Sequence, residues 1–185
     1  MRNRIIQYYV EGENEKTFIN EVKNIFLLPG KVEVLNILTK SIGVMRIRSL
    51  KANTVCILIF DTDVEDSSKI RQLKENIELL LKSNNVGKVI IIPQIRNFEE
   101  ELIYSTNIKS IKDFIPSLSS KNFKTDFNKN KGNILKKLNK HGYNNQKMWS
   151  RNLSDNSLFK KVYEVAYIKN NSNLVKGDSS AVKLK

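Results

Sequence analysis

The stretch Val55-Cys56-Ile57-Leu58-Ile59-Phe60-Asp61-Thr62-Asp63 decides the fold. Six consecutive apolar residues end at two acids, and a continuous apolar run of this length is typical of a strand buried on both faces of a parallel sheet. The chain must leave the core where the run stops, so Asp61 and Asp63 are expected at an edge of the sheet. Residues i and i+2 of an extended segment point to the same side, so both aspartates can face one ligand.

Other strands and helices alternate around this central strand. The expected strands cover residues 4–10, 31–38, 55–60 and 88–92. The expected helices cover residues 14–26 with Asn14 as the N-cap, residues 44–50, and a segment capped by Ser67 or Ser68. Strands that alternate with helices predict an α/β fold, with a central, mostly parallel sheet flanked by helices.

The strand pattern disappears beyond Asn97. Helices are expected over residues 98–104, 108–115, 133–139 and 158–168, and Phe123 and Phe127 are spaced as the buried face of a further helix. Residues 170–185 are polar and are expected to be flexible. We therefore expect a core over residues 1–104, a basic, mainly helical extension over residues 105–169 packed on that core, and a flexible tail over residues 170–185.

The net charge of +13 is concentrated in the second half of the chain. Residues 1–104 hold 15 Lys and Arg against 14 Asp and Glu, whereas residues 105–185 hold 17 against 5. This division suggests that the basic second half binds a polyanion and that the first half, which contains the candidate acids, acts on it. The alternative is that a lysine-rich composition serves solubility alone.

Several other classes of protein do not fit the sequence. The apolar run at residues 5–10 is too short for a signal peptide or a membrane span, so a cytoplasmic protein without a membrane partner is expected. Cys56 is the only cysteine, which excludes an intrachain disulfide and a cysteine-based metal site. Because it lies in the apolar run, Cys56 is expected to be a buried, inert thiol.

Acidic residues follow two of the expected strands. Glu11 follows the first strand, Glu15 lies one helical turn later on the same side, and Asp61 follows the central strand. Ligands of open α/β sheets bind outside the carboxyl ends of strands, where a few carboxylates suffice for a hard cation such as Mg²⁺ or Mn²⁺. The alternative is that these acids make only a turn, a cap and a solvated helix start.

Two motifs resemble those of a known family. The sequence Val10-Glu11-Gly12-Glu13-Asn14-Glu15 resembles the first motif of Toprim domains, in the form with a second Glu four positions on that occurs in OLD-type nucleases and RloB-like proteins. The sequence Ile57-Leu58-Ile59-Phe60-Asp61-Thr62-Asp63 resembles the second, the Asp-x-Asp motif. Both motifs stand in the family's order, and the resemblance covers residues 4–104. It implies a Toprim-like, Rossmannoid core.

The resemblance also implies roles for single residues. Glu11 would be the metal-linked acid or general base, Asp61 and Asp63 metal ligands, and Glu15 a ligand of a second ion. Phe98-Glu99 resembles a Phe-Glu pair that follows the next strand in RloB-like sequences, which makes Glu99 a further candidate ligand. The neighbouring Glu100 and Glu101 leave this register open, because a helix can turn only one or two of the three toward a site.

A lysine is the last element that the resemblance supplies. OLD-type nucleases use a lysine beyond the carboxylates, and the nearest candidates are Lys121 and Lys124. We expect Lys124 to be the catalytic one. The resemblance also implies an ATPase partner protein. The chain itself has no Gly-x-x-x-x-Gly-Lys loop, so nucleotide hydrolysis is not expected of it. The residues expected to contact nucleic acid are Lys121, Lys124, Lys136, Lys137, Lys140 and Arg151.

These features together predict a nuclease that depends on Mg²⁺ or Mn²⁺. It would cut phosphodiesters of DNA or RNA, and the similarity to the RloB-like group implies a role in phage defence. One alternative is a noncatalytic Toprim module that binds nucleic acid or a partner protein. Another is a nucleotidyl transferase, as in primases.

Overall fold

A computed structural model describes residues 5–63, 66–117, 119–155 and 157–160, together with 162, 174–175 and 183. The strands are β1 (Ile6–Val10), β2 (Lys31–Val34), β3 (Thr54–Asp61), β4 (Val86–Gln94) and β5 (Leu174–Val175). The helices are α1 (Glu13–Val22), α2 (Val44–Arg48), α3 (Ser67–Leu81), α4 (Phe98–Ser105), α5 (Ile111–Phe114), α6 (Ser120–Lys129) and α7 (Ile134–Lys140). The predicted α/β class is confirmed.

The strands form a single parallel sheet in the order β2-β1-β3-β4-β5. β1 pairs directly with β3, in a register that runs from Ile6 opposite Val55 to Tyr9 opposite Leu58. The two strands whose ends carry Glu11 and Asp61 are therefore neighbours. Because they are parallel, their carboxyl ends reach the same edge of the sheet, which is where Glu11 and Asp61 stand.

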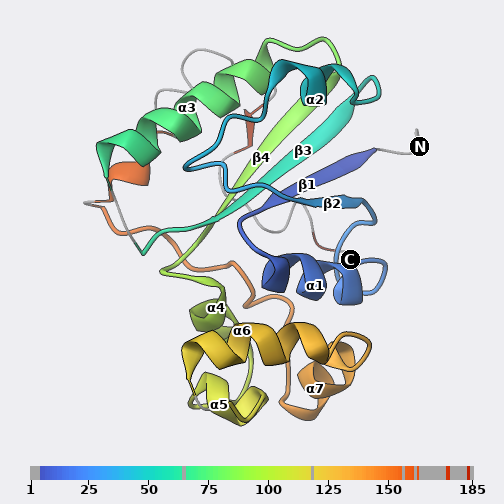
Figure 1. Ribbon diagram of the computed structural model, residues 1–185, viewed down its shortest axis with the longest axis vertical. Helices are drawn as coiled ribbons and strands as arrows, with labels where there is room; N and C mark the ends of the chain where they lie inside the picture. The colour runs from blue at the N-terminus through green and yellow to red at the C-terminus, as the bar shows by residue number, and fades with distance from the viewer. Residues whose placement is uncertain are drawn as a thin grey trace.

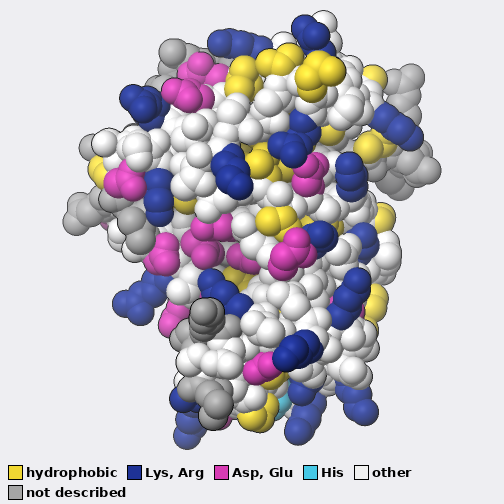
Figure 2. Space-filling view, viewed as in Figure 1, with side chains coloured by type: hydrophobic (Ala, Val, Ile, Leu, Met, Phe, Trp, Pro, Cys, Tyr) yellow, Lys and Arg dark blue, Asp and Glu magenta, His cyan; other side chains and the backbone are white. Residues whose placement is uncertain are grey.

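The sheet lies between two layers of helices. α2 and α3 cover one face, α1 covers the other, and α4 to α7 form a group beyond the carboxyl ends of the strands (Figure 1). In the same view, acidic side chains gather across the middle of the molecule, between the sheet and this helical group (Figure 2). The carboxyl edge of the sheet thus borders the part of the chain that carries most of the net positive charge.

Alternation along the central strand builds the two cores. Val55, Ile57 and Ile59 contribute to the core shared with α1, whereas Cys56, Leu58 and Phe60 contribute to the core under α3. Side chains of successive residues in a strand point to opposite faces, so a strand that is apolar throughout can supply both cores. Cys56 is buried, as predicted.

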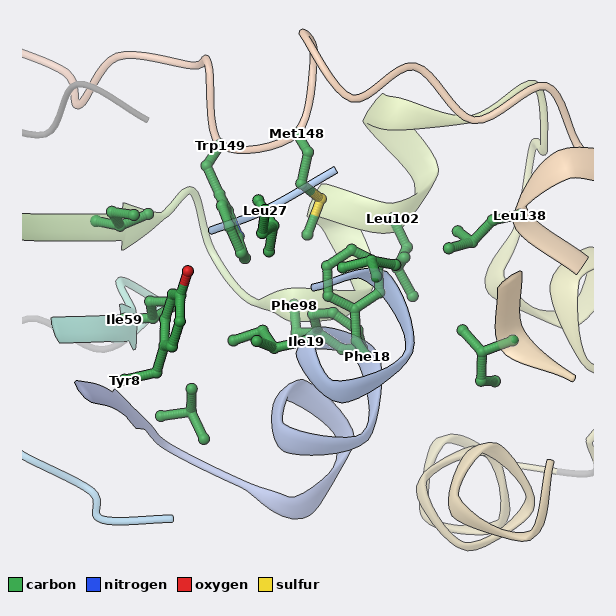
Figure 3. Close-up of a cluster of buried hydrophobic side chains, with 14 of the residues drawn as sticks. Tyr8, Phe18, Ile19, Leu27, Ile59, Phe98, Leu102, Leu138, Met148 and Trp149 are labelled. Atoms are coloured by element: carbon green, nitrogen blue, oxygen red, sulfur yellow. The ribbon is translucent and has the colours of Figure 1, made fainter. Parts of the chain in front are cut away.

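The helical extension shares the core of the sheet. The ring of Phe18 on α1 lies 5.4 Å from that of Phe98 and 6.1 Å from that of Trp149, measured between ring centroids (Figure 3). Phe98 in turn contacts Phe127 of α6 at 5.5 Å. Phe123 and Phe127 are buried, as their spacing indicated. The extension is packed on the sheet through one continuous aromatic cluster.

Several boundaries differ from the predicted ones, each for a local reason. Gly12, and not Asn14, is the N-cap of α1, and the helix ends at Val22 because Lys23 is extended and Asn24 adopts a left-handed φ of 72°. Asp66 replaces Ser67 or Ser68 as the cap of α3, since its side chain accepts the backbone N–H groups of Ser68 and Lys69.

The strands differ in extent as well. β2 ends at Val34, and the Asn36 side chain then accepts the backbone N–H of Leu38 in a turn that leaves the sheet. β4 continues through Pro93 to Gln94. Within the described residues β5 pairs only with Val89 and Ile90, so the missing N–H of Pro93 interrupts no ladder there.

The C-terminal segment is only partly described. Residues 158–160 and 162 are helical, at the start of the helix predicted over residues 158–168, and the other residues of that helix lie outside the described ones. In the segment predicted as a flexible tail, Leu174–Val175 form β5 and Lys183 makes a bridge with Leu27. The rest of that tail also lies outside the described residues. In the part of the chain that the structure describes, no helix has the length and apolar character needed to span a membrane.

One buried carboxylate joins the end of the sheet to the extension. Glu101 is 0% exposed, and its Oε1 accepts the backbone N–H of Ile95 at 2.8 Å and Nη2 of Arg151 at 3.0 Å. Its Oε2 accepts the backbone N–H of Trp149 at 3.1 Å. Trp149 has a φ of 58°, a conformation that a bulky residue adopts only when its surroundings hold it there. Glu101 therefore fixes both the β4–α4 turn and the loop that passes over it.

Replacing Glu101 by alanine should strongly destabilise the protein, because it removes the charge that pairs with Arg151 and leaves two backbone N–H groups without their acceptor. We expect a loss of about 3 kcal/mol in the free energy of unfolding, measured by urea denaturation. The matched control is Glu100→Ala on the same helix, which should change stability by less than about 0.5 kcal/mol. Equal effects of the two substitutions would show that the Glu101 carboxylate does not anchor this region.

Candidate active site

A pocket of about 390 Å³ opens at the carboxyl edge of the sheet. It lies where β1 and β3 end and where α1 and α4 begin, and α6 closes it from the side of the extension. Its lining residues are Glu11, Gly12, Glu13, Asn14, Glu15, Asn36, Asp61, Phe98, Glu99, Lys124 and Asn128. The structure thus brings together four of the five predicted metal-binding acids and one of the predicted lysines.

Glu11 is held at both of its carboxylate oxygens. Asn36 Nδ2 donates to Oε1 at 2.7 Å, and the backbone N–H of Asp61 donates to Oε2 at 3.2 Å. The amide of Asn36 cannot turn round, because its own oxygen accepts the backbone N–H of Leu38. Glu11 is therefore a pre-oriented carboxylate, and its fixed position depends on the pairing of β1 with β3.

Asp61 ends β3 at the floor of the pocket. With its amide oriented to satisfy both neighbours, Gln94 donates to Asp61 Oδ1 at 2.6 Å and accepts from Trp149 Nε1 at 3.2 Å. Burial, followed by repulsion from Glu15, Glu11, Asp63 and Glu99, raises the pKa of Asp61 to about 9. Without a cation in the pocket, Asp61 carries a proton at neutral pH.

Glu15 is the most enclosed acid of the pocket, with 6% of its surface exposed. Burial is the main reason that its pKa is raised to about 7, and repulsion from Glu11 and Glu99 adds to it, while Lys124 acts in the opposite direction. Gly12 leaves room for this carboxylate, because a Cβ at that position would stand 3.0 Å from Glu15 Oε2.

The structure distinguishes the three consecutive glutamates at the start of α4. Glu99 lines the pocket, whereas Glu101 is buried against Trp149 and Arg151. Glu100 does neither. The register that the sequence left open therefore places Glu99 at the site.

Asp63 stands apart from the other acids. It is exposed and does not line the pocket, although its charge contributes to the raised pKa of Asp61. The expected arrangement, in which Asp61 and Asp63 face one ligand, required an extended backbone through both. β3 instead ends at Asp61, and Thr62 turns toward β4 through backbone bonds to Gln94 and Arg96.

The predicted basic residues fall in three places. Lys124 lines the pocket, and the side chain of Lys121, one turn earlier on α6, lies outside the described residues. Lys136, Lys137 and Lys140 lie on α7, away from the pocket, and make no ion pair within the described part of the chain. Arg151 is paired with Glu101 and also donates to the backbone oxygen of Ile95, so its guanidinium supports the fold.

The donor set of the pocket suits a hard divalent cation. Its acids offer only oxygen ligands, they repel one another, and Lys124 is the single basic side chain among the lining residues. A bound cation would relieve that repulsion. As the side chains lie, however, no three acidic, histidine or cysteine side chains of the described residues form a group that could hold a metal ion. An ion bound as these side chains lie would therefore take at most two of these carboxylates directly, and water would supply its other ligands.

Sequence reasoning missed the amides around the acids. Asn36 orients Glu11, Gln94 contacts Asp61, and Asn14 and Asn128 line the wall on the side of α6. The sequence contained only a weak indication that these amides belong to the site. Asn36 and Gln94 are polar residues at the carboxyl end of apolar runs, which is the same kind of place that identified Glu11 and Asp61.

The raised pKa of Asp61 predicts an unusual dependence of stability on pH. The folded protein binds this proton more tightly than the unfolded chain does, so stability should be greatest below about pH 4 for this group and should fall as the pH rises toward about 9. Asp61→Asn imitates the protonated acid. It should raise the Tm of the metal-free protein at about pH 8 by ~2–4 °C or more. It should also make Tm depend less on pH. Glu100→Gln, the control, should leave the dependence of Tm on pH unchanged. A lower Tm for Asp61→Asn would contradict the burial and repulsion that raise the pKa of Asp61.

Comparison with models of protein families gives no match. No curated protein and no solved structure matches the chain either. The function proposed below therefore rests on the geometry of this pocket and on the two motifs that border it.

Proposed function

We propose that this protein is a nuclease that depends on Mg²⁺ or Mn²⁺ and cuts the phosphodiester bonds of DNA or RNA. The observation that carries this proposal is the convergence of Glu11 and Asp61 from two neighbouring parallel strands on one pocket, joined there by Glu15 and Glu99. Keeping several carboxylates together with Lys124 as the one basic side chain of the lining costs stability, as the raised pKa values of Asp61 and Glu15 indicate. A group of acids that is costly to the fold is typical of a functional site.

Glu11 and Asp61 would hold the cation, with Glu15 and Glu99 as further ligands, whereas Asp63, outside the pocket, would act only through its charge. Such an ion supplies charge neutralisation for a phosphate and lowers the pKa of a bound water. The other ligands that the ion needs would be water and the oxygens of the substrate, which is the usual arrangement for Mg²⁺. This accounts for a pocket that is rich in carboxylate oxygens and yet has room for a substrate.

Hydrolysis adds one water molecule across a phosphorus–oxygen bond. The water oxygen forms the new bond to phosphorus, its proton passes to a carboxylate, and the bridging oxygen leaves with the electron pair of the broken bond. Glu11 is the acceptor that the family resemblance implies, and its hydrogen bonds to Asn36 and to the Asp61 backbone keep it oriented. Lys124, which reaches the pocket from α6, would add positive charge beside the phosphate.

We further propose membership of the Toprim group, near the OLD-type and RloB-like proteins. The two motifs support this, because both stand at the carboxyl ends of adjacent strands and border one pocket. A cytoplasmic location, a role in phage defence and an ATPase partner protein come with that proposal. The Lys and Arg excess of residues 105–185 supports nucleic acid as the substrate.

A noncatalytic module that binds nucleic acid is the second candidate. The observation in its favour is that the acids, as they lie, do not form a closed metal-binding group. The two candidates differ in what the acids do. In a noncatalytic module their neutralisation would strengthen the binding of nucleic acid, and no substrate would be cut with any cation. A primase-like nucleotidyl transferase would instead require nucleoside triphosphates.

Asp61→Asn and Glu11→Gln should each reduce cleavage by at least ~10³-fold, because each removes a ligand charge while keeping the shape of the side chain. The measurement is a cleavage assay with Mg²⁺ or Mn²⁺ against single- and double-stranded DNA and RNA. Binding of the same substrates should persist in both variants. Glu100→Gln, which alters an acid outside the pocket, is the control and should cleave normally. Activity within a few-fold of the unaltered protein for both site variants would rule out the metal mechanism.

The basic helix α7 should contribute to affinity and not to the chemical step. Neutralising Lys136, Lys137 and Lys140 together as glutamines should weaken binding to all sequences alike, and each lost phosphate contact should reduce the slope of log affinity against log salt by about 0.7–0.9. At saturating substrate the cleavage rate should stay nearly normal. Fluorescence anisotropy over a range of salt concentrations provides the measurement. An unchanged affinity and salt slope would assign these lysines to solubility alone.

A further inference from the structure

A residue that lines the pocket has a buried side-chain amide without a partner among the described residues. Asn14 lies in the first turn of α1 and is only 6% exposed, and its Nδ2 has no hydrogen-bond partner within the described part of the chain. Leaving a buried donor unsatisfied costs about 1–3 kcal/mol. Asn14 is also a lining residue of the pocket that holds the acids. A buried amide kept at such a cost beside a pocket calls for a ligand that accepts a hydrogen bond.

The neighbouring residues fix the direction in which this amide points. Asn128 Nδ2 donates to the backbone oxygen of Lys124 at 3.0 Å, and a carbonyl can only accept, so the orientation of Asn128 is set. The same Nδ2 donates to Asn14 Oδ1 at 2.8 Å. Asn14 must therefore turn its oxygen toward α6 and its NH₂ group away from it. Thr17 supports this arrangement by donating to Asn128 Oδ1 at 2.7 Å.

The surroundings of Asn14 combine donors with acids. Lys124 lines the same pocket, and Gly12 puts no side-chain cap on the start of α1, a helix terminus that favours negative charge. The acids that face the pocket are Glu11, Glu13, Glu15, Glu99 and Asp61. They would repel a simple anion such as a carboxylate. A phosphate group can instead place one oxygen on the donors and share another with a cation held by the acids.

We propose that Asn14, together with Lys124 and the start of α1, binds a nonbridging oxygen of the substrate phosphate. The choice of ligand rests on the proposed function, and the inference deepens it by naming the residue that positions the phosphate beside the acids. Asn14 is thereby a direct contact of the substrate. Asn128 and Thr17 act through it as positioning residues, because they hold its amide in the orientation that donates.

The side-chain amide of Asn14 itself supplies the test. In ¹H–¹⁵N spectra of the full-length protein, titration with inorganic phosphate in the presence of Mg²⁺ should shift the Asn14 NH₂ resonances in a saturable manner. These resonances are assigned by their loss in Asn14→Asp. The NH₂ group of Asn84, an exposed residue before β4 at the opposite edge of the sheet, should stay unmoved. A phosphate titration that leaves the Asn14 resonances in place would overturn the proposal and assign the amide to bound water.

Two substitutions test the affinity. Asn14→Asp keeps the shape and the oxygen that Asn128 contacts but replaces the donor by a negative charge, and it should weaken phosphate binding by at least about tenfold. Asn14→Ala removes the donor without adding charge and covers the case in which Asn14→Asp fails to fold. Asn84→Asp adds the same charge far from the pocket and should bind like the unaltered protein. Equal affinities of Asn14→Ala and the unaltered protein would also overturn the proposal.

The outcomes separate this inference from the proposed function. If the unaltered protein cleaves nucleic acid but phosphate does not shift the Asn14 resonances, the proposed Asn14 contact is wrong and the proposed nuclease activity still stands. Saturable shifts at Asn14 without cleavage under any cation would support the phosphate site and overturn the nuclease. The readout at Asn14 therefore does not depend on activity.

Discussion

The parallel pairing of β1 with β3 is the constraint on which the rest of the structure depends. It places Val10 and Phe60, the last apolar residues of two separate segments, at the same edge of the sheet. The residues that follow them are acids, and the backbone N–H of Asp61 is bonded directly to the Glu11 carboxylate. The same hydrogen-bond ladder that stabilises the sheet thus sets the spacing of the acids. A slip in the register of these strands would disperse the site even if every helix stayed intact.

The sequence was sufficient for the central features of the fold. The apolar run before Asp61 is long and uniform, so its burial in a parallel sheet could be predicted, and the acids at the strand ends followed from it. Element boundaries were less predictable, because local contacts override propensity there. Asn24 stops α1 through its left-handed backbone, and Asp66 caps α3 in place of a serine. Neither contact has a strong signal in a single sequence.

The finer geometry of the site could not be predicted, because it depends on residues far apart along the chain. The glutamates of α4 are chemically alike, and their different roles follow from partners about 50 residues later, where Trp149 and Arg151 bind Glu101. The orientation of Asn14 likewise depends on Asn128, which lies on a helix of the extension. Such choices are settled by tertiary packing, whereas the pattern of strands is settled by local apolarity.

The aromatic cluster that joins α1 to the extension has a consequence for the evolution of the protein. Phe18, Phe98 and Phe127 are each almost fully buried, and they come from the start, the middle and the later part of the chain. A fragment that ended at residue 104 would expose the rings of Phe18 and Phe98 to water and would lose the wall of the pocket that carries Lys124. The sheet and the basic helices therefore share one interior, and a substitution on either side of it must suit the other. The extension cannot be exchanged for another module without rebuilding the interior beneath it.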